Sequence, residues 1–506
     1  MKSQIKGGAF LTFVSLFIGN AISLFYTPFM LNTLGQVEYG LYGLANSIVG
    51  YLTVLDFGFG NAAIRYTAKF KAENNEDKLK YMYGMFLALY TLIGIITFII
   101  GYFFSQNAQL FFKNGLSIEE LSTVKILLIL SSINLAISFP FGIFTSIITA
   151  YEKFIFLKVS SIVRYIINPL VYIPVLFFGY KSIGLIVVTT ILNFIFLSIN
   201  LIYCFYKLKI KISFKKFDFN LLKEIFSYSV WIFVGSVVNQ LWWNSGQFML
   251  GVYSSAVSIA IFNLAMQFKS YFESFATSIS SVFLPRLTSM ESNKSSDEEF
   301  TNYFIKVGRL QFILISLITT GFILFGKQFI YIWAGKDYHL AYYVTLIIFI
   351  PLALVDTQTL GIAILQAKNK HKFRSIVYLC VAIACIITCI PFIKKYDVIG
   401  CALATSFALL LGNLFIMNWY YYKKINLNIF KFWKELFSML PGILISTVIM
   451  YLLLKFVLPI IKSYRLLLPF ILIYIIVFVI IMFFMSFNEY EKELVRNFIR
   501  RFRRRI

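Results

Sequence analysis

The chain contains one pattern twice, and the two copies lie about 217 residues apart. Asn20 and Asn239 are 219 residues apart, and Arg65 and Arg286 are 221 apart. Further matched pairs keep offsets of 216 to 219: Gly142 with Gly361, Lys153 with Lys370, Pro174 with Pro391 and Gly184 with Gly400. So small a drift indicates one ancestral unit that was duplicated. Internal repeats in a chain of many membrane spans are typical of carriers that move one half against the other.

The composition indicates a membrane protein built from helices. Hydrophobic residues make up 59% of 506, charged residues 13%, and the mean hydropathy is +0.80. A soluble domain carries about 25% charged residues. The apolar segments are long and continuous, whereas membrane strands alternate over about ten residues, so helices of about 20 residues are expected.

We predict an all-α polytopic membrane protein with about fourteen transmembrane helices, arranged as two pseudo-symmetric six-helix lobes plus two C-terminal helices. The predicted domains are 1–217, 218–430 and 431–506, the last ending in a basic amphipathic tail. The predicted spans are 8–33, 40–63, 82–106, 122–150, 157–179, 182–206, 225–250, 257–284, 305–327, 340–366, 374–393, 396–422, 435–459 and 464–486. Because six spans return the chain to its starting side, both lobes have the same orientation, and the cleft between them is the expected substrate site.

The net charge of +24 reports topology and not nucleic-acid binding. With the N-terminus inside, the inner segments hold 34 lysines and arginines and the outer segments hold 9. The positive-inside rule therefore predicts that both termini are cytoplasmic. The tail from Glu491 combines apolar residues on one side with arginines around them, which predicts an interfacial helix on anionic membrane lipids.

The sequence supports no catalytic or metal site and no resident cofactor. The five cysteines lie in or at the ends of predicted spans without zinc-type spacing, and the two histidines lie in separate loops. No Gly-x-x-x-x-Gly-Lys-Ser/Thr loop occurs, so the chain is not an ATP-driven pump by itself.

Three ionisable residues lie deep in the second predicted lobe, where charge is costly. Lys269 and Glu273 are four residues apart and share one helix face. They form either a self-neutralising pair that holds helices together or a cavity-lining pair that opens when a substrate or an ion enters, which we favour. Asp356 lies beside Thr357 and Gln358, and either packs helices or binds a coupling ion.

The first lobe and its repeat partner supply further charged candidates. Asp56 lies among glycines in span two, where it is a candidate cation ligand. Arg65 and Arg286 end equivalent helices on the inner side, and they either anchor those helices or hold a phosphate from both sides of the cleft mouth. Arg164 lies about two turns into span five, where it either snorkels to the interface or lines the transport path.

Two repeat-related amides, Asn20 and Asn239, lie within spans one and seven. Each either lines the cleft or links helices by hydrogen bonds, and the sequence does not separate these two roles.

Two stretches carry a family resemblance. Residues 31–42 (LNTLGQVEYGLY) and 55–65 (LDFGFGNAAIR) are similar to the first two helices of polysaccharide exporters in the multidrug/oligosaccharidyl-lipid/polysaccharide superfamily. Within that superfamily, the chain most resembles the Wzx-type flippases for O-antigen repeat units. The plan of six, six and two spans extends the resemblance over the whole chain.

The resemblance implies a substrate and a mechanism. Family members move a short oligosaccharide on undecaprenyl diphosphate to the outer leaflet of the bacterial cytoplasmic membrane by alternating access, with spans one, two, seven and eight lining the cleft. It also implies coupling to a proton or sodium gradient, and candidate partners among the other membrane proteins of polysaccharide assembly. Arg65, Arg286, Lys269 and Arg164 are then candidates for diphosphate binding, and Asp56, Glu273 and Asp356 for ion coupling.

Two other functions compete with this expectation. A multidrug exporter of the same superfamily needs acidic and aromatic groups for organic cations, whereas here the deep cations rival the carboxylates in number. A polysaccharide polymerase or ligase typically resembles its relatives in having a large outer loop with an active site. The longest outer segment, about 107–121, is short and lacks a catalytic cluster.

Overall fold

The computed structural model describes residues 2–503 other than 294, 369, 371 and 456–462, and every regular element in these ranges is helical. The all-α prediction is therefore confirmed. The chain packs as two compact units, of which the first holds residues 1–263 and 389–398 and the second holds 264–388 and 399–506. Helices α9 and α13 each contribute residues to both units.

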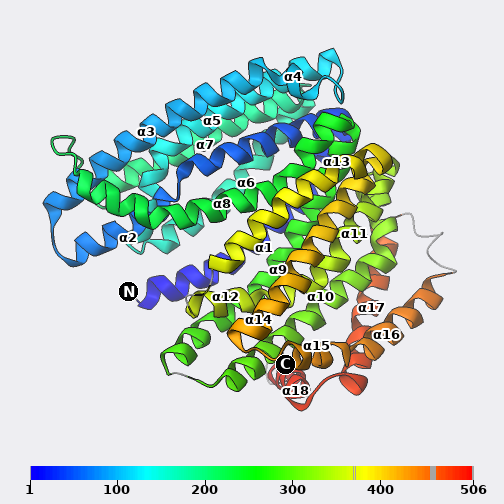
Figure 1. Ribbon diagram of the computed structural model, residues 1–506. Coiled ribbons are helices and arrows are strands. Elements are labelled where there is room, and N and C mark those ends of the chain that lie inside the picture. Colours follow the sequence, from blue (N-terminus) through cyan, green and yellow to red (C-terminus); the bar gives the residue numbers. More distant parts are fainter. Residues whose placement is uncertain (1, 294, 369, 371, 456–462, 504–506) are drawn as a thin grey trace. The chain divides into compact units, whose positions relative to one another are not determined.

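The first unit holds the first half of the chain. Its helices α3, α5 and α7 lie side by side (Figure 1), and α1 packs against α5, α6 and α8. The elements are α1 (Lys2–Leu52), η1 (Thr53–Asp56), α2 (Phe59–Ala72), α3 (Glu76–Gln106), α4 (Ala108–Phe112), α5 (Ile118–Ala150), α6 (Phe154–Phe177), α7 (Lys181–Tyr206), α8 (Phe219–Tyr253) and the start of α9 (Ala256–Ser292).

The second unit is built around α10, which contacts α11, α15, α16 and α17. Its buried core runs from Leu287 in α9 to Phe487 near the end of the chain. The elements after α9 are α10 (Asp297–Trp333), η2 (Lys336–Tyr338), α11 (His339–Asp356), α12 (Thr359–Ala367), α13 (Lys372–Leu409), η3 (Leu410–Met417), α14 (Asn418–Ile425), α15 (Ile429–Phe437), α16 (Leu440–Leu454), α17 (Tyr464–Met485) and α18 (Glu489–Arg503).

Eleven helical segments in the described ranges are long and apolar enough to cross a membrane. One of them, 10–72, covers two predicted spans and leaves helical geometry at Gly35, whose φ of 73° and ψ of 172° suit glycine. Another, 372–425, also covers two predicted spans and breaks at Asp397. Helix α9, with 37 residues, is not among the eleven. The count of fourteen spans stays a prediction.

Two left-handed residues mark corresponding turns in the two repeats. Lys181 has a φ of 46° and Asp397 a φ of 54°, and they lie 216 residues apart, as Gly184 and Gly400 do. Near Lys181, the Glu38 carboxylate accepts a hydrogen bond from Ser182. At the other turn, the Asp397 carboxylate accepts one from Ser258 at 2.7 Å. Each turn is therefore bound by an acid–hydroxyl contact.

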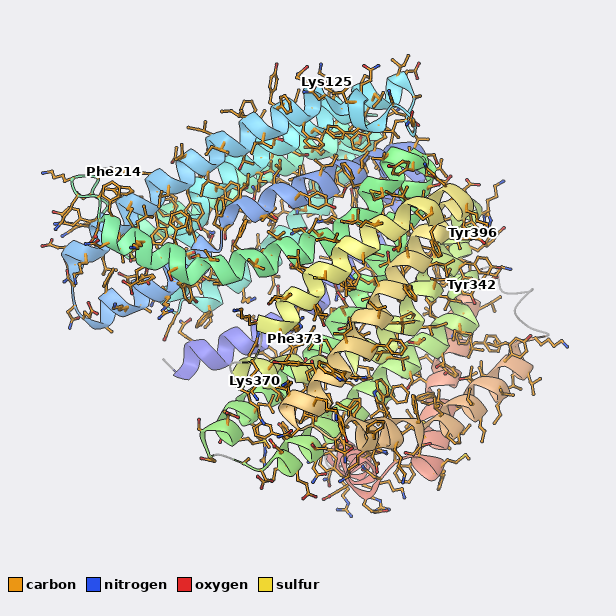
Figure 2. The ribbon with its side chains drawn as sticks, viewed as in Figure 1. Lys125, Phe214, Tyr342, Lys370, Phe373 and Tyr396 are labelled. Atoms are coloured by element: carbon orange, nitrogen blue, oxygen red, sulfur yellow. The ribbon has the colours of Figure 1, made fainter. Side chains whose placement is uncertain are left out.

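Helix α13 illustrates how one long element is delimited. Figure 2 shows Lys370 and Phe373 near its first turn and Tyr396 at the end of its first straight stretch, beside the Asp397 break. Phe373 stacks on Tyr420 with ring centroids 4.1 Å apart, which fixes that first turn against α14.

The compact units and the predicted domains divide the chain differently. Helix α8, assigned by the repeat to the second lobe, packs in the first unit. Packing and ancestry are separate properties, so the domain limits at 217 and 430 stay a prediction.

Candidate functional site

The second predicted span is broken where Asp56 lies. The chain passes from α1 through the short helix η1 to α2, and Asp56 is the last residue of η1. Its Oδ1 atom accepts a hydrogen bond from the Tyr90 hydroxyl of α3 at 2.8 Å. The backbone N–H groups of Gly58 and Gly60 also interact with this carboxylate. A half-buried acid is thus held at the N-terminal end of α2, where the helix dipole favours negative charge.

Two consecutive left-handed residues produce the break. Phe57 has a φ of 51° and Gly58 a φ of 76°. A side chain at Gly58 would begin 2.8 Å from Ile232 of α8, so only glycine fits there. Phe57 accepts an unfavourable conformation while its ring stacks on Phe233, with centroids 5.0 Å apart. The glycines around Asp56 therefore serve a bend and a close approach.

Arg65 lies nine residues further along, and among the described residues it forms no ion pair with Asp56. Its side chain is exposed, and its guanidinium lies 4.5 Å from the centroid of the Tyr228 ring of α8. This cation–π contact leaves the hydrogen-bonding edges of the guanidinium available to an anion.

In the second unit, Lys269 and Glu273 form an ion pair on α9. The Lys269 Nζ atom lies 2.7 Å from Glu273 Oε2, as their four-residue spacing predicts. The Lys269 side chain is 10% exposed and that of Glu273 is 30% exposed. The pair is therefore shielded at the lysine and reachable at the carboxylate.

Asp356 ends α11 at a second break in a predicted span, and α12 begins three residues later at Thr359. The residue is buried, and its Oδ2 atom makes no hydrogen bond within the described residues. Both Lys269 and Glu273 act on it electrostatically. The structure therefore brings together three candidates, of which Lys269 and Asp356 lie 87 residues apart along the chain.

A polar belt continues from this group. The Gln311 amide of α10 donates to the Ala276 carbonyl at 3.1 Å and to Thr359 Oγ1 at 2.7 Å. Thr359 in turn donates to the Asp356 carbonyl at 2.5 Å. Gln311 Oε1 is buried and makes no hydrogen bond within the described ranges. Two acceptor oxygens, on Asp356 and Gln311, thus lack donors among the described residues in one connected network.

Arg286 lines a pocket of about 580 Å³ between α9 and α10. Its guanidinium lies 5.8 Å from the Tyr303 ring centroid, and Lys306 lies 3.6 Å from the Tyr490 ring centroid. The remaining lining residues are Phe283, Met290, Ser295, Glu299 and Asn302. Glu299 is engaged in capping α10 through Ser296. The pocket thus offers two cations beside aromatic and amide groups.

A smaller pocket of about 290 Å³ lies at the corresponding place in the first unit. Its residues Lys69, Lys78, Tyr81, Met82 and Met85 each precede a residue of the Arg286 pocket by 221 positions. Its charged residues are three lysines and two acids, against two cations and Glu299 in the Arg286 pocket: Lys69, Lys78, Lys216, Asp218 and Glu224. Both pockets therefore carry a net charge of +1, and only the pocket of the second unit holds an arginine.

The other three candidates are placed separately. Arg164 is half-buried in α6, and its Nη2 atom donates to Asn193 Oδ1 at 3.1 Å. Asn20 is half-buried in α1, and Asn239 is exposed on α8. Their roles as substrate ligands stay predictions.

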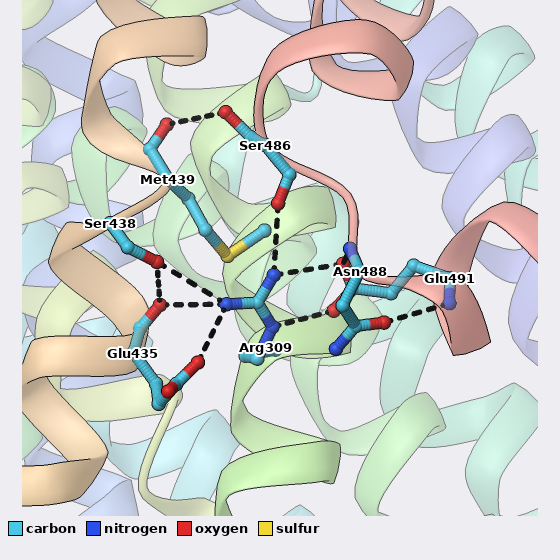
Figure 3. Close-up of polar contacts among 7 residues, drawn as sticks. All are labelled: Arg309, Glu435, Ser438, Met439, Ser486, Asn488 and Glu491. Carbon is cyan, nitrogen blue, oxygen red and sulfur yellow. Dashed lines mark hydrogen bonds and ion pairs between the residues drawn. The ribbon is translucent and has the colours of Figure 1, made fainter.

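One buried charged group was missed by the sequence reasoning. Arg309 of α10 is 4% exposed, and its Nε and Nη2 atoms bind both carboxylate oxygens of Glu491 at 2.7 and 2.9 Å (Figure 3). Its Nη1 atom donates to the Glu435 carbonyl at 2.9 Å, and Nη2 donates to the Ser486 carbonyl at 3.0 Å. Arg309 therefore ties α15 and α18 to α10.

The sequence carries a signal for the start of α18, although not for its contact with Arg309. Asn488 and Glu491 exchange hydrogen bonds at 2.9 Å as a capping box of α18. The positive-inside pattern places Arg309 among the 34 inner basic residues, and the amphipathic pattern places Glu491 at the start of an interfacial tail. The tail is helical, and its first turn docks through this buried carboxylate.

Within the described residues, no group of three or more histidine, cysteine, aspartate or glutamate side chains is placed to hold a metal ion. All five cysteines are free thiols.

The chain is similar to known membrane proteins in sequence and in fold. Residues 5–291 match the family described as polysaccharide biosynthesis protein. A putative O-antigen transporter of Shigella flexneri is 20% identical over 78% of this chain and 92% of its own length. The uncharacterized membrane protein EpsK of Bacillus subtilis is 22% identical over 82% of each chain.

Two solved structures share the fold. The lipid II flippase MurJ, in an inward closed conformation, is similar with a TM-score of 0.70 at 21% identity, over 94% of this chain and 97% of its own. An inward-facing multidrug resistance transporter of the MATE family gives 0.64 at 12% identity, over 79% and 92%. At these identities, the likeness shows the fold alone.

Proposed function

Because this chain belongs to the polysaccharide biosynthesis protein family, we propose that it is a flippase for a lipid-linked oligosaccharide. The proposed cargo is a surface-polysaccharide repeat unit, such as that of O-antigen, on undecaprenyl diphosphate. It moves from the cytoplasmic to the outer leaflet of the bacterial cytoplasmic membrane by alternating access. The relative named as a putative O-antigen transporter supports this class of cargo.

The Arg286 pocket is the observation that carries the proposal. A diphosphate presents several oxyanions, and guanidinium and ammonium groups bind them by charge-assisted hydrogen bonds. Arg286 and Lys306 both line the pocket, and neither forms an ion pair with a described residue. A volume of about 580 Å³ accommodates a diphosphate with part of its first sugar.

The group formed by Lys269, Glu273 and Asp356 supports coupling to an ion gradient. It holds one base and two acids, so it carries a net charge of −1 when all three are ionised. A single proton or Na⁺ neutralises it, and buried net charge is costly. Ion entry would thus change the interactions of α9 with α11. Asp56, held by Tyr90 at the break before α2, is the corresponding proposal for the first unit.

The rival function is export of organic cations. The MATE family shares this fold, so the fold does not separate the two functions. Charge favours an anionic cargo: the Arg286 pocket holds two cations, Arg286 and Lys306, and one acid, Glu299, so its net positive charge repels organic cations. An enzyme of polysaccharide polymerisation or ligation is a weaker alternative, because the relatives with assigned roles are named as transporters or flippases.

A cellular complementation experiment tests the proposal. The double variant Arg65→Ala/Arg286→Ala should abolish surface polysaccharide in a strain lacking the native protein while its level in the membrane stays normal. The matched control, Arg465→Ala, removes an exposed arginine from the predicted outer side and should restore normal polymer. Normal polymer from the double variant would remove both arginines from substrate binding.

A further inference from the structure

Helix α6 has two contrasting faces. Arg164, Asn168 and Tyr172 follow one another at intervals of four and therefore lie on one face. Exposed apolar side chains occupy the opposite face: Val159, Val163, Ile166, Leu170 and Phe177. In a membrane, the apolar face meets lipid, and the polar face must turn toward protein or water because polar groups are costly in hydrocarbon.

The arginine end of this polar face joins three helices. Arg164 donates to Asn193 of α7, and the Asn193 amide donates to Asn134 Oδ1 and Ser138 Oγ of α5, both at 2.7 Å. Arg164, Asn134 and Ser138 remain half-buried. Since polar groups are costly in hydrocarbon, these half-exposed groups must turn away from lipid.

The tyrosine end adds hydroxyls and aromatic faces. The hydroxyls of Tyr172 and Thr189 of α7 are 3.0 Å apart, and the Tyr172 ring lies 5.8 Å from the ring of Tyr26 in α1. The Tyr26 hydroxyl and Asn168 Oδ1 are buried without a hydrogen bond to any described residue. An unmet buried polar group costs about 1–3 kcal/mol. Both atoms therefore keep unused hydrogen-bonding capacity within the first unit.

Arg164 also lacks a neutralising acid. Its guanidinium donates a hydrogen bond to the neutral Asn193 and lies 5.8 Å from the centroid of the Phe196 ring. No ion pair involves Arg164 among the described residues. Arg164 is thus a half-buried cation with amides and hydroxyls around it. Such a site suits a ligand that carries an anionic group among many hydroxyls.

We propose that this polar face, with the facing groups of α1, α5 and α7, binds the glycan part of the substrate. We name this set of residues the α6 chamber: Arg164, Asn168, Tyr172, Asn193 and Tyr26. The inference rests on the proposed function, because it takes the substrate to be a lipid-linked glycan. Amides and hydroxyls bind sugar hydroxyls, tyrosine rings pack on sugar faces, and Arg164 binds an oxyanion. That oxyanion is either the carboxylate of an acidic sugar or the diphosphate.

Binding to the full-length protein in nanodiscs tests the chamber. Three probes are compared: a disaccharide containing glucuronic acid, a neutral disaccharide of the same size, and farnesyl diphosphate. Arg164→Gln should weaken the probe whose oxyanion it binds roughly 10–100-fold, and Arg164→Lys should recover part of that loss. Loss confined to the acidic disaccharide identifies a sugar carboxylate, and loss confined to farnesyl diphosphate identifies the diphosphate. Asn168→Ala should weaken both disaccharides.

The controls separate binding from packing. Arg465→Gln removes an equal charge from the exposed start of α17 and should leave all three affinities unchanged. A lower melting temperature for Arg164→Gln with unchanged affinities would show that Arg164 only links helices, and would overturn the proposal. Failure of the wild-type protein to bind any probe would overturn it as well.

The chamber and the proposed function fail independently. Binding needs no translocation, so Arg164-dependent binding in a protein that does not flip lipid-linked glycan would refute only the flippase function. Flipping that is insensitive to Arg164→Gln and Asn168→Ala would refute only the chamber.

Discussion

The two units interrupt equivalent spans in opposite ways. In the first unit, the chain leaves helical geometry at 57–58, between η1 and α2, whereas α5 continues unbroken from Ile118 to Ala150. In the second repeat, α9 continues unbroken from Ala256 to Ser292, whereas α11 and α12 are separated at 357–358. The repeat thus breaks its second span in one copy and its fourth in the other.

The local sequence explains this exchange. Gly58 takes a left-handed conformation, and the residue 219 positions later is Thr277, which stays helical. Asp356 ends α11, and the residue 219 positions earlier is Ile137, inside α5. Glycine permits the first break, and polar residues that bond to nearby backbone favour the second.

Both breaks place an aspartate at the same local position. Asp56 and Asp356 each lie three residues before the first residue of the following helix. Tyr90 satisfies Asp56, while Asp356 keeps an oxygen without a donor among the described residues and faces an ion pair. The comparison teaches that both repeats place an acid at a broken span, although the broken span is a different one in each copy.

The largest effect is expected from Gly58→Val. The left-handed φ of 76° costs a β-branched residue about 1–2 kcal/mol, and the contact with Ile232 adds about 1–3 kcal/mol. Thermal unfolding in detergent should therefore show a large loss of stability together with loss of transport. Thr277→Val, on the unbroken α9, is the matched control and should change little. Equal stability of the two variants would show that the break is not required.

Neutralising the two acids should separate their roles. Asp356→Asn removes the excess negative charge from the buried group, so gradient-driven transport in proteoliposomes should fall at least about tenfold, or 1.4 kcal/mol in the barrier. Asp56→Asn should reduce transport less, because an amide oxygen still accepts the Tyr90 hydrogen bond. If Asp56→Asn is the more damaging change, the coupling site lies in the first unit instead.

Exchanging the charges in Lys269→Glu/Glu273→Lys should preserve the ion pair but reverse its order relative to Asp356. Folding, measured by size-exclusion profile and melting temperature, should be retained, because the two ends still pair on one face. The transport rate should fall several-fold, since the carboxylate moves away from its exposed position. A silent exchange would mean that the pair serves only helix packing.

The smallest effect is expected from Tyr90→Phe. It removes the 2.8 Å hydrogen bond to Asp56 and should lower stability by about 1–2 kcal/mol. Tyr102→Phe on the same helix removes an exposed hydroxyl and serves as the control. Thermal unfolding of the two variants measures the difference. No difference between them would remove Tyr90 as the residue that holds the first break.

The sequence predicted the helical class, because long apolar runs form helices in a membrane, and two short motif stretches predicted the family. The spacing of four predicted the Lys269–Glu273 pair. It did not predict that Asp356 joins them, because contact between separate spans depends on tertiary packing. Glycines beside Asp56 indicated a bend, but nothing local indicated the partner Tyr90, 34 residues away.

The Arg309–Glu491 contact shows the same boundary between local and tertiary information. The capping pattern of Asn488 and Glu491 is readable in the sequence, and the start of α18 follows from it. The buried arginine that Glu491 binds lies 182 residues away, and no periodic pattern connects the two. Local geometry was therefore predictable, and pairing between distant helices was not.

The most direct test of the central claim is flipping by the purified protein. Proteoliposomes would contain an undecaprenyl-diphosphate oligosaccharide whose terminal sugar an impermeant enzyme labels only in the outer leaflet. We predict protein-dependent labelling of the inner pool that rises with an imposed proton or sodium gradient and is lost in Arg286→Ala/Lys306→Ala. Unchanged labelling in that variant, or no labelling above protein-free liposomes, would contradict the account.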